Sequence, residues 1–520
     1  MLTLNKNQKG NIESDVAFFL YFLTAVIVIL VFLPCLQAGF LNIDDQKHFL
    51  ENHAVLDLSA GSVQAIFTQT VNNVYIPLTS LSFAIEHHFF GFNAFVFHLD
   101  NLVFHVINVL LVLLLAQRMG LSTAAAFLAA LIFGVHPMKV ESVAWVTERK
   151  DVLYALFYLL ALHQYWSYLK TRSIKNYLGT LFLGFVSILA KPMALSLPLV
   201  LLLLDYLQGR RWDKNVFIEK IPFFLYAVEI ASLSYVFNMR NPISDILQAA
   251  LIWTWSFNFY ICKFLWPFHV SFVYLLPHPI ALSNWPYALS LGMFILIIGI
   301  LIRWRKNRFM IFAFAFYILS IFFILRFDEK VDFTVVSDRF MYLPCLGFCL
   351  GAGFVLDRWG SVKYLKIGFI LIFTILGGVL TFKQCRVWHD PIIFWDEVVR
   401  EYPKSFEFYF YRGQAYIAKG ENNLALADFS KVIELNPLLV NAYNNRGVVY
   451  LSQGKYKEAL ADINRAIQLD PSDFDAYIVR ANIEEKNKEF DMATKDFTYA
   501  QQLSGVSFAN SLRRVQEESK

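Results

Sequence analysis

Long apolar runs fill the first three quarters of the chain. A helix needs about 20 apolar residues to cross the hydrocarbon core of a bilayer. Candidate runs lie near 15–37, 96–117, 122–137, 151–169, 176–190, 193–207, 221–238, 285–302, 309–326, 339–357 and 364–382. This pattern predicts an all-α, polytopic transmembrane bundle over residues 1–382. The first run is about as long as a full span and many more follow, so we interpret it as a membrane helix, not a cleaved signal peptide.

Short basic turns between these runs predict which side each loop faces, because Lys and Arg collect in cytoplasmic loops. The basic residues are Lys6, Lys9, Lys170, Arg172, Lys175, Arg210, Arg211, Lys214, Arg303, Arg305, Lys306, Arg308, Arg358, Lys363 and Lys366. All of them face the cytoplasm only if the apolar, Trp-rich stretch 246–266 does not cross. We therefore predict an interfacial or re-entrant segment there. This leaves about eleven spans, with the N-terminus inside and the C-terminal region outside.

The pattern changes near Phe382, where charged residues become frequent. Residues 383–520 hold 38 of the 86 charged residues of the chain. Within them a set of positions recurs every 34 residues, which is the period of the tetratricopeptide repeat (TPR). The recurring residues are Tyr409, Arg412, Gly413, Tyr416, Ala425, Phe429 and Pro437, then Tyr443, Arg446, Gly447, Tyr450, Ala459, Ile463 and Pro471, then Tyr477, Arg480, Ala481, Ala493 and Phe497.

These positions predict an α-solenoid over 383–520, with repeats at about 406–439, 440–473 and 474–507. Small residues such as Gly413, Gly447 and Ala459 allow paired helices to approach closely, and the aromatic residues fill the space between pairs. We expect a partial leading repeat at 391–402 and a polar capping helix at 506–518. Such an array usually binds or docks a protein, although it could also only pack on the membrane domain.

Composition narrows the function classes. The chain is 57% hydrophobic and its net charge of +4 is small. It contains no Walker loop, GxGxxG, GxSxG or HExxH motif, and no large cytoplasmic segment that could hold a nucleotide. Any group donor must therefore already be in the membrane. The five cysteines show no metal-type CxxC spacing and are interpreted as packing residues.

Asp44 and Asp45 follow the first predicted span directly. Adjacent carboxylates at a membrane exit are costly if buried, so they can mark a general base with a metal or substrate ligand beside it. A solvated turn is the alternative. The sequence does not distinguish which of the two residues would be the base.

Charged residues of both signs crowd the loop 136–151. It holds His136, Lys139, Glu141, Glu148, Arg149, Lys150 and Asp151. The basic pair Arg149–Lys150 lies outside in the predicted topology, against the usual charge bias, and could hold a lipid phosphate. Arg339, after Asp338 at the outer start of a span, could do the same, and Lys191 lies on the same face. The alternative is a set of interfacial anchors whose side chains snorkel.

Several short motifs, taken in order, resemble one family. They are Asp44–Asp45, Tyr75-Ile-Pro-Leu-Thr79, His98-Leu-Asp-Asn-Leu102, His136-Pro followed by Val140-Glu-Ser-Val-Ala-Trp-Val146 and Glu148-Arg-Lys-Asp151, Lys191-Pro-Met-Ala194, Asp338-Arg-Phe-Met-Tyr-Leu-Pro344 and Arg386-Val-Trp-His-Asp390. With the trailing repeats they resemble bacterial relatives of the transmembrane-and-tetratricopeptide-repeat O-mannosyltransferases, within the GT-C superfamily. The chain departs from the family pattern at Ile76, where an Arg is common, and at Asp338, where a Glu is usual.

The resemblance implies a GT-C bundle whose first extracytoplasmic loop, residues 39–95, carries short helices. It implies a polyprenyl-phosphate sugar donor, with mannose the leading candidate, and a protein Ser or Thr hydroxyl acceptor. Asp44 or Asp45 would be the base. Arg339, Arg149, Lys150, His136 and Lys191 would bind the donor phosphate, and Glu141, Asp151 and Asp338 would orient the sugar or the acceptor. A divalent cation, Mg or Mn, is compatible with the site but not required.

Two other functions remain open at this point. One is a non-enzymatic, membrane-anchored TPR scaffold for envelope assembly, and the other is a transporter of a lipid-linked sugar. A transporter would place polar residues at mid-bilayer, whereas here they gather at one face. The absence of a glycosylation sequon fits a bacterial inner membrane with the TPR domain in the periplasm. The partners would be the lipid-linked sugar, membrane lipids and a protein acceptor, without nucleic acid.

Overall fold

The structure is a computed structural model that describes residues 6–237, 245–325, 335–358, 363–505 and 508–518. These residues form helices and connecting segments, and the only β pairing among them is an isolated bridge between Val71 and Val74. The all-α prediction is confirmed. The chain divides into two compact units, Met1–His389 and Asp390–Lys520. The predicted boundary at 382/383 falls inside helix α16 (Lys363–Trp388), because that helix continues beyond the end of its apolar run.

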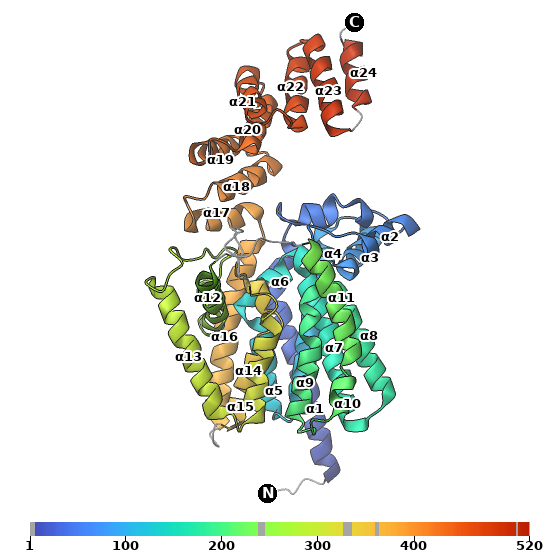
Figure 1. Cartoon of the computed structure of the whole chain (residues 1–520), viewed down its shortest axis with the longest axis vertical. Coiled ribbons are helices and arrows are strands. Elements are labelled where there is room, and N and C mark those ends of the chain that lie inside the picture. The colour runs from blue at the N-terminus through green and yellow to red at the C-terminus, as the bar shows by residue number, and fades with distance from the viewer. Residues whose placement is uncertain (1–5, 238–244, 326–334, 359–362, 506–507, 519–520) are drawn as a thin grey trace. The chain divides into compact units, whose positions relative to one another are not determined.

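The first unit is a bundle of apolar helices, many of which run parallel to one another (Figure 1). They are α1 (Lys6–Phe32), α4 (Ala94–Arg118), α5 (Thr123–Val135), α7 (Arg149–Thr171), α8 (Ile174–Ala190), α9 (Leu197–Leu207), α11 (Ile221–Phe237), α13 (Trp285–Trp304), α14 (Arg308–Ile321), α15 (Leu346–Arg358) and α16. Short helices α6 (Val140–Ala144) and α10 (Lys214–Ile218) connect some of them. Helix α7 packs against α4 and α8, and α5 packs against α4 and α15.

Four segments of the described residues are long and apolar enough to cross a membrane: Phe18–Gln37, Ala94–Arg118, Trp285–Trp304 and Tyr364–Trp388. The pair α5 and Pro137–Ala144 would add a fifth if it is one span bent by 55°. Helix α13 exposes Ile295 and Leu296 by 62% and 63%. Such an apolar surface is suited to lipid, so this is a membrane protein. The eleven-span topology and its sidedness stay predictions.

Residues 246–266, predicted not to cross, form helix α12 (Ile246–Leu265). In Figure 1 this helix is seen nearly end-on, while α13, α14 and α16 are seen from the side. It buries the polar side chains of Ser256 and Asn258, and it is not one of the four segments apolar enough to cross a membrane. Whether it crosses the membrane stays a prediction. Most of segment 327–338, which connects the predicted spans 309–326 and 339–357, lies outside the described residues.

The segment between α1 and α4 folds into its own helical layer. It contains η2 (Gln46–Leu50), η3 (His53–Val55), α2 (Ala60–Thr68) and α3 (Pro77–Phe90). Phe49, Phe83 and Phe97 are fully buried, and their rings contact one another. Aromatic side chains contribute large buried areas, which explains how so short a segment holds a fixed shape. This layer carries Asp44 and Asp45.

The second unit is a solenoid of paired helices. Its elements are α17 (Pro391–Glu401), α18 (Phe406–Ala418), α19 (Asn422–Leu435), α20 (Val440–Ser452), α21 (Tyr456–Leu469), α22 (Phe474–Lys486), α23 (Phe490–Ser504) and α24 (Ala509–Glu518). A Cβ atom at Gly413 would lie 2.9 Å from the Phe429 ring, and one at Gly447 would lie 2.7 Å from Ile463. The paired helices touch at these positions, which favours small residues, and the third repeat has Ala481 at the equivalent place. The start of the predicted cap, 506–507, lies outside the described residues.

An ion pair repeats with the solenoid. Arg446 donates from Nε and Nη2 to the two carboxylate oxygens of Asp462, both at 2.7 Å. Arg412 with Asp428 and Arg480 with Asp496 form the same fork, again 16 residues apart. Each Asp occupies the same place in the second helix of its repeat. We call these three pairs the solenoid forks.

Candidate functional site

Asp45 is a buried carboxylate with a full set of donors. Its Oδ2 accepts from the backbone N–H of Leu41 at 2.7 Å. Its Oδ1 accepts from the indole Nε1 of Trp145 at 3.0 Å, from the backbone N–H of Thr147 at 3.2 Å and from the Thr147 hydroxyl. Burial raises the pKa of Asp45 to about 6. Through these hydrogen bonds, Asp45 attaches the first-loop turn to segment 145–147.

Asp44 accepts fewer hydrogen bonds than Asp45 does. It is half-buried, and its Oδ1 accepts from the side-chain amide of Asn72 at 3.3 Å. Its carboxylate therefore keeps capacity for a further hydrogen bond. Since a general base must have room to take a proton, Asp44 fits that role better than Asp45.

Three of the predicted phosphate-binding cations surround one carboxylate, Glu148. Lys150 Nζ lies 3.0 Å from Glu148 Oε1, and Lys191 Nζ lies 3.3 Å from Glu148 Oε2. Arg339 Nε lies 3.4 Å from Glu148 Oε1. Charge-assisted bonds are usually about 2.7–2.9 Å long. The cations are therefore only loosely held by this shared partner.

Two further carboxylates complete what we call the Glu148 cluster, which consists of Glu141, Glu148, Lys150, Asp151, Lys191 and Arg339. Glu141 binds the guanidinium of Arg339 and accepts its backbone N–H at 3.0 Å. Asp151 binds Lys191 Nζ at 2.7 Å. Three cations and three carboxylates leave the cluster close to neutral. It lies where α6, η5 (Val146–Glu148) and the start of α7 meet the turn before α15.

The cluster cations retain a small accessible surface. The exposed fractions of the Lys150, Lys191 and Arg339 side chains are 11%, 9% and 13%. The guanidinium of Arg339 also lies over the rings of Trp145 and Phe340, at 5.5 and 5.1 Å from their centroids. These stacking contacts hold its orientation. The cations are therefore held in fixed orientations, and a small part of each remains accessible.

Arg149 and His136 are not brought to the cluster. Arg149 is fully buried, pairs with Glu86, and donates to Asn101 and to the carbonyl of Phe97 at 2.9 Å each. His136 hydrogen-bonds the carbonyl of Phe264 through Nε2 at 3.0 Å, and its ring stacks on the Phe264 ring. Both side chains are occupied by contacts that hold helices together. They remain predicted phosphate ligands without a geometry that favours that role.

Asp338 lies next to the cluster in chain and space. Its Oδ2 accepts from the Tyr274 hydroxyl at 2.8 Å, while the buried Oδ1 has no partner among the described residues. Burial, with the nearby charge of Glu141, raises the pKa of Asp338 to about 7. A buried oxygen without a donor is costly. The sugar- or acceptor-orienting role predicted for Asp338 stays a prediction, because its side chain is fully buried.

The electrostatics of Glu148 and His48 connect the first loop to the cluster. Burial alone would raise the pKa of Glu148, but Lys150, Lys191 and Arg339 outweigh it and hold that pKa well below its usual value. Burial, together with the charge of Lys150, lowers the pKa of His48 to about 3. The Asp44 turn and the cluster are thus close enough to interact electrostatically.

Sequence reasoning missed the central residue of the cluster. It named Glu148 within the charged loop but gave it no role, although Glu148 is the residue on which the cations converge. The signal was its position between Glu141 and Asp151 and directly before two basic residues. Among the described residues no group of three or more His, Cys, Asp or Glu side chains could hold a metal ion.

The fold and the site define an all-α membrane protein with a C-terminal TPR solenoid. A tetratricopeptide repeat profile matches residues 440–473, and a TPR repeat profile matches 413–454. Among solved structures, the Arabidopsis OM64 TPR domain is 22% identical, with a TM-score of 0.22, over 22% of this chain and 97% of that domain.

The homologues of the chain are protein O-mannosyl-transferases. The human protein O-mannosyl-transferase TMTC4 is 24% identical over 352 residues, which are 54% of this chain and 47% of that protein. The Caenorhabditis elegans protein O-mannosyl-transferase F38B6.6 is 23% identical over 436 residues, 79% of this chain and 61% of that protein. The chain spans about half the length of the human relative. The resemblance inferred from the short motifs is confirmed.

Proposed function

We propose that the protein is a GT-C-type glycosyltransferase that moves a sugar from a polyprenyl-phosphate carrier to a Ser or Thr hydroxyl of a protein. Mannose is the sugar that the names of the homologues favour. The observation that carries the proposal is the Glu148 cluster, where three cations that share one carboxylate lie beside the turn that bears Asp44. We place this face on the extracytoplasmic side of a bacterial inner membrane, together with the TPR domain.

The reaction is one displacement. The acceptor hydroxyl oxygen forms a bond to the anomeric carbon, and the bond from that carbon to the phosphate oxygen breaks. The electron pair leaves with the polyprenyl phosphate, and Asp44 takes the hydroxyl proton. Because the base and the leaving group lie on opposite faces of the sugar, the configuration at the anomeric carbon inverts.

The cluster supports the departure of the phosphate. The leaving group gains negative charge in the transition state, and cations held in place stabilise that charge without reorganisation. Arg339 presents a planar fork that suits two phosphate oxygens, and Lys150 and Lys191 add point charges. A phosphate leaving group has a low pKa, so no general acid is needed. Asp338 and Glu141 would orient sugar hydroxyls.

Transfer of labelled mannose tests this proposal directly. The purified full chain in lipid is incubated with radiolabelled polyprenyl-phosphate mannose and envelope proteins. Wild type is expected to label protein, and Asp44→Asn is expected not to. Asp57→Asn is the matched control, because Asp57 is an exposed carboxylate in the same loop.

The alternatives predict other results. A TPR scaffold would label no protein, and its docking function would survive Asp44→Asn. A lipid-sugar transporter would move the donor across vesicles without covalent transfer. Equal labelling by wild type and Asp44→Asn would support glycosyltransferase activity but show that Asp44 is not the base.

A further inference from the structure

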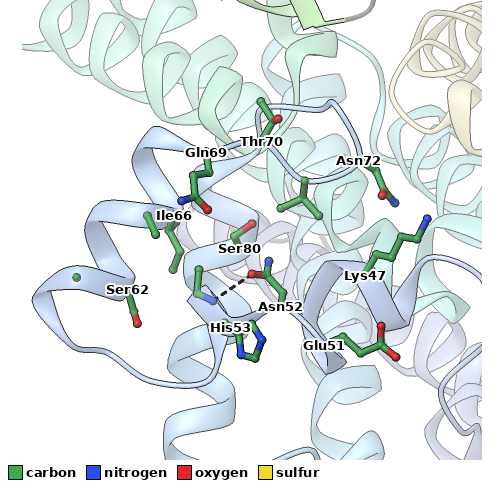
Figure 2. A pocket seen from close by; sticks show the side chains of 14 residues that line it. Lys47, Glu51, Asn52, His53, Ser62, Ile66, Gln69, Thr70, Asn72 and Ser80 are labelled. Carbon is green, nitrogen blue, oxygen red and sulfur yellow. Dashed lines mark hydrogen bonds between the residues drawn. The ribbon is translucent and has the colours of Figure 1, made fainter. Parts of the chain in front are cut away.

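The first-loop layer contains a cavity of about 610 Å³. Figure 2 shows it between η2, η3, α2 and the segment that follows α2, with Lys47 and Asn72 on one side and Ser62 on the other. Binding sites for small ligands usually measure roughly 300–1,000 Å³. The cavity is thus large enough for a few amino-acid residues.

The cavity adjoins the proposed base. Asn72 lines it, and the same side chain donates to Asp44 Oδ1 at 3.3 Å. Lys47, three residues after Asp44, also lines it. A group that enters the cavity and reaches Asn72 therefore arrives beside the Asp44 carboxylate.

The lining offers hydrogen bonds without a surplus of charge. The side chains of Lys47, Glu51 and Gln69 are exposed, and none has a hydrogen-bond partner among the described residues. The lining therefore presents a single lysine, Lys47, whereas the Glu148 cluster presents three cations that could contact the oxygens of one phosphate. Ala65 and Ile66 add a small apolar wall.

We propose, on the basis of the proposed function, that this cavity binds the acceptor as an extended polypeptide segment around the target Ser or Thr. Amide and hydroxyl side chains pair with peptide N–H and C=O groups, and the apolar wall takes small side chains. The two substrates then approach Asp44 by different routes. The acceptor enters through the first loop, and the lipid-linked donor enters at the Glu148 cluster.

A peptide-binding measurement tests the cavity without requiring chemistry. The probe is a fluorescent peptide of Ala, Gly and Ser residues around one Thr, titrated with the full chain in lipid nanodiscs and followed by anisotropy. Ala65→Trp fills the cavity, and Ala60→Trp on the exposed start of α2 is its matched control. Gln69→Ala removes one amide from the lining, with the exposed Gln64→Ala as control.

We expect Ala65→Trp to weaken peptide binding by about tenfold or more, equivalent to about 1.4 kcal/mol. Gln69→Ala should weaken it by a smaller factor, and both controls should bind as wild type does. The slow release of mannose from the donor to water should be unchanged in all four variants.

The two proposals fail in different ways. Unchanged peptide binding in Ala65→Trp and Gln69→Ala, or no peptide binding by wild type, overturns the acceptor cavity. A raised donor KM for mannose release in Ala65→Trp also overturns it, because the cavity would then hold the donor. Peptide binding that depends on Ala65 and Gln69, without any use of the donor, supports the cavity and contradicts the glycosyltransferase.

Discussion

The solenoid and the membrane unit use charged side chains in opposite ways. In the solenoid forks each Arg has its own Asp, and both arms of the fork are about 2.5–2.9 Å long. In the Glu148 cluster three cations share Glu148 at 3.0–3.4 Å, and two of them also pair closely with a second carboxylate, Arg339 with Glu141 and Lys191 with Asp151. Separate, short pairs fix a structure, whereas the long bonds to the shared Glu148 can be exchanged for bonds to a ligand. The comparison separates charges that stabilise the fold from charges that can act on a substrate.

The largest expected contrast is between two aspartates. Asp44→Asn should lower transfer by roughly 10²–10⁴-fold, the range for loss of a general base, with little change in Tm. Asp462→Asn should lower the Tm of the solenoid and leave transfer to a short soluble peptide unchanged. Transfer rates and thermal melts of both variants check this. Loss of transfer in Asp462→Asn, with Asp44→Asn active, would reverse the comparison.

Asp45→Asn tests whether Asp45 has a structural role, because its hydrogen bonds hold the turn that carries Asp44. Its amide nitrogen would face the N–H of Leu41, so one buried donor would lose its acceptor. We expect a cost of about 1–3 kcal/mol in unfolding free energy, together with reduced transfer. Asp45→Asn with wild-type stability and no transfer would instead make Asp45 the base.

Glu148→Gln should be the most destabilising change in the cluster. It removes the carboxylate that Lys150, Lys191 and Arg339 share and leaves buried positive charge. Breaking a buried ion pair in this way costs about 3–5 kcal/mol. Denaturant unfolding of the purified protein measures it. Asp428→Asn in a solenoid fork is the control and should cost less, because Arg412 is 18% exposed and keeps Asp396 as a second partner.

Substitutions at the adjacent residues Arg149 and Lys150 should have different effects, on stability at Arg149 and on donor binding at Lys150. Lys150→Gln removes a partly accessible cation and should raise the donor KM several-fold with little loss of stability. Arg149→Gln leaves Glu86 buried without its partner and should lower the Tm, with the donor KM unchanged in the folded fraction. Steady-state kinetics on both variants test this, and a raised donor KM in Arg149→Gln would return that residue to the phosphate site.

The smallest expected effect is on acid stability. The pKa of Glu148 is held well below its usual value, so its ion pairs contribute stability above pH 4.5, the ordinary Glu pKa. That contribution is lost as the pH falls toward the lowered pKa. Melts of wild type from pH 4.5 downward should therefore decline more steeply than those of Glu148→Gln. Parallel curves would show that Glu148 is not held ionised by its cations.

The sequence predicts the solenoid well and the cluster only in part. Each repeat has the same local packing, so Gly413 and Gly447 appear at equal spacing with the residues they touch. The Glu148 cluster instead joins 141–151, Lys191 and Arg339, which no periodicity connects. Only tertiary contacts distinguish Asp44 from Asp45 or Lys150 from Arg149, since each pair is adjacent in sequence and alike in chemistry.

Donor binding is the measurement that tests the central contrast most directly. Polyprenyl-phosphate mannose is titrated into nanodiscs that hold wild type, Arg339→Gln or Arg446→Gln, and the Kd is measured for each. If the cluster binds the donor phosphate, Arg339→Gln weakens binding about tenfold or more, since a charged hydrogen bond contributes about 1.5–3 kcal/mol. Arg446→Gln should bind as wild type does. Equal donor affinity in wild type and Arg339→Gln would contradict the account.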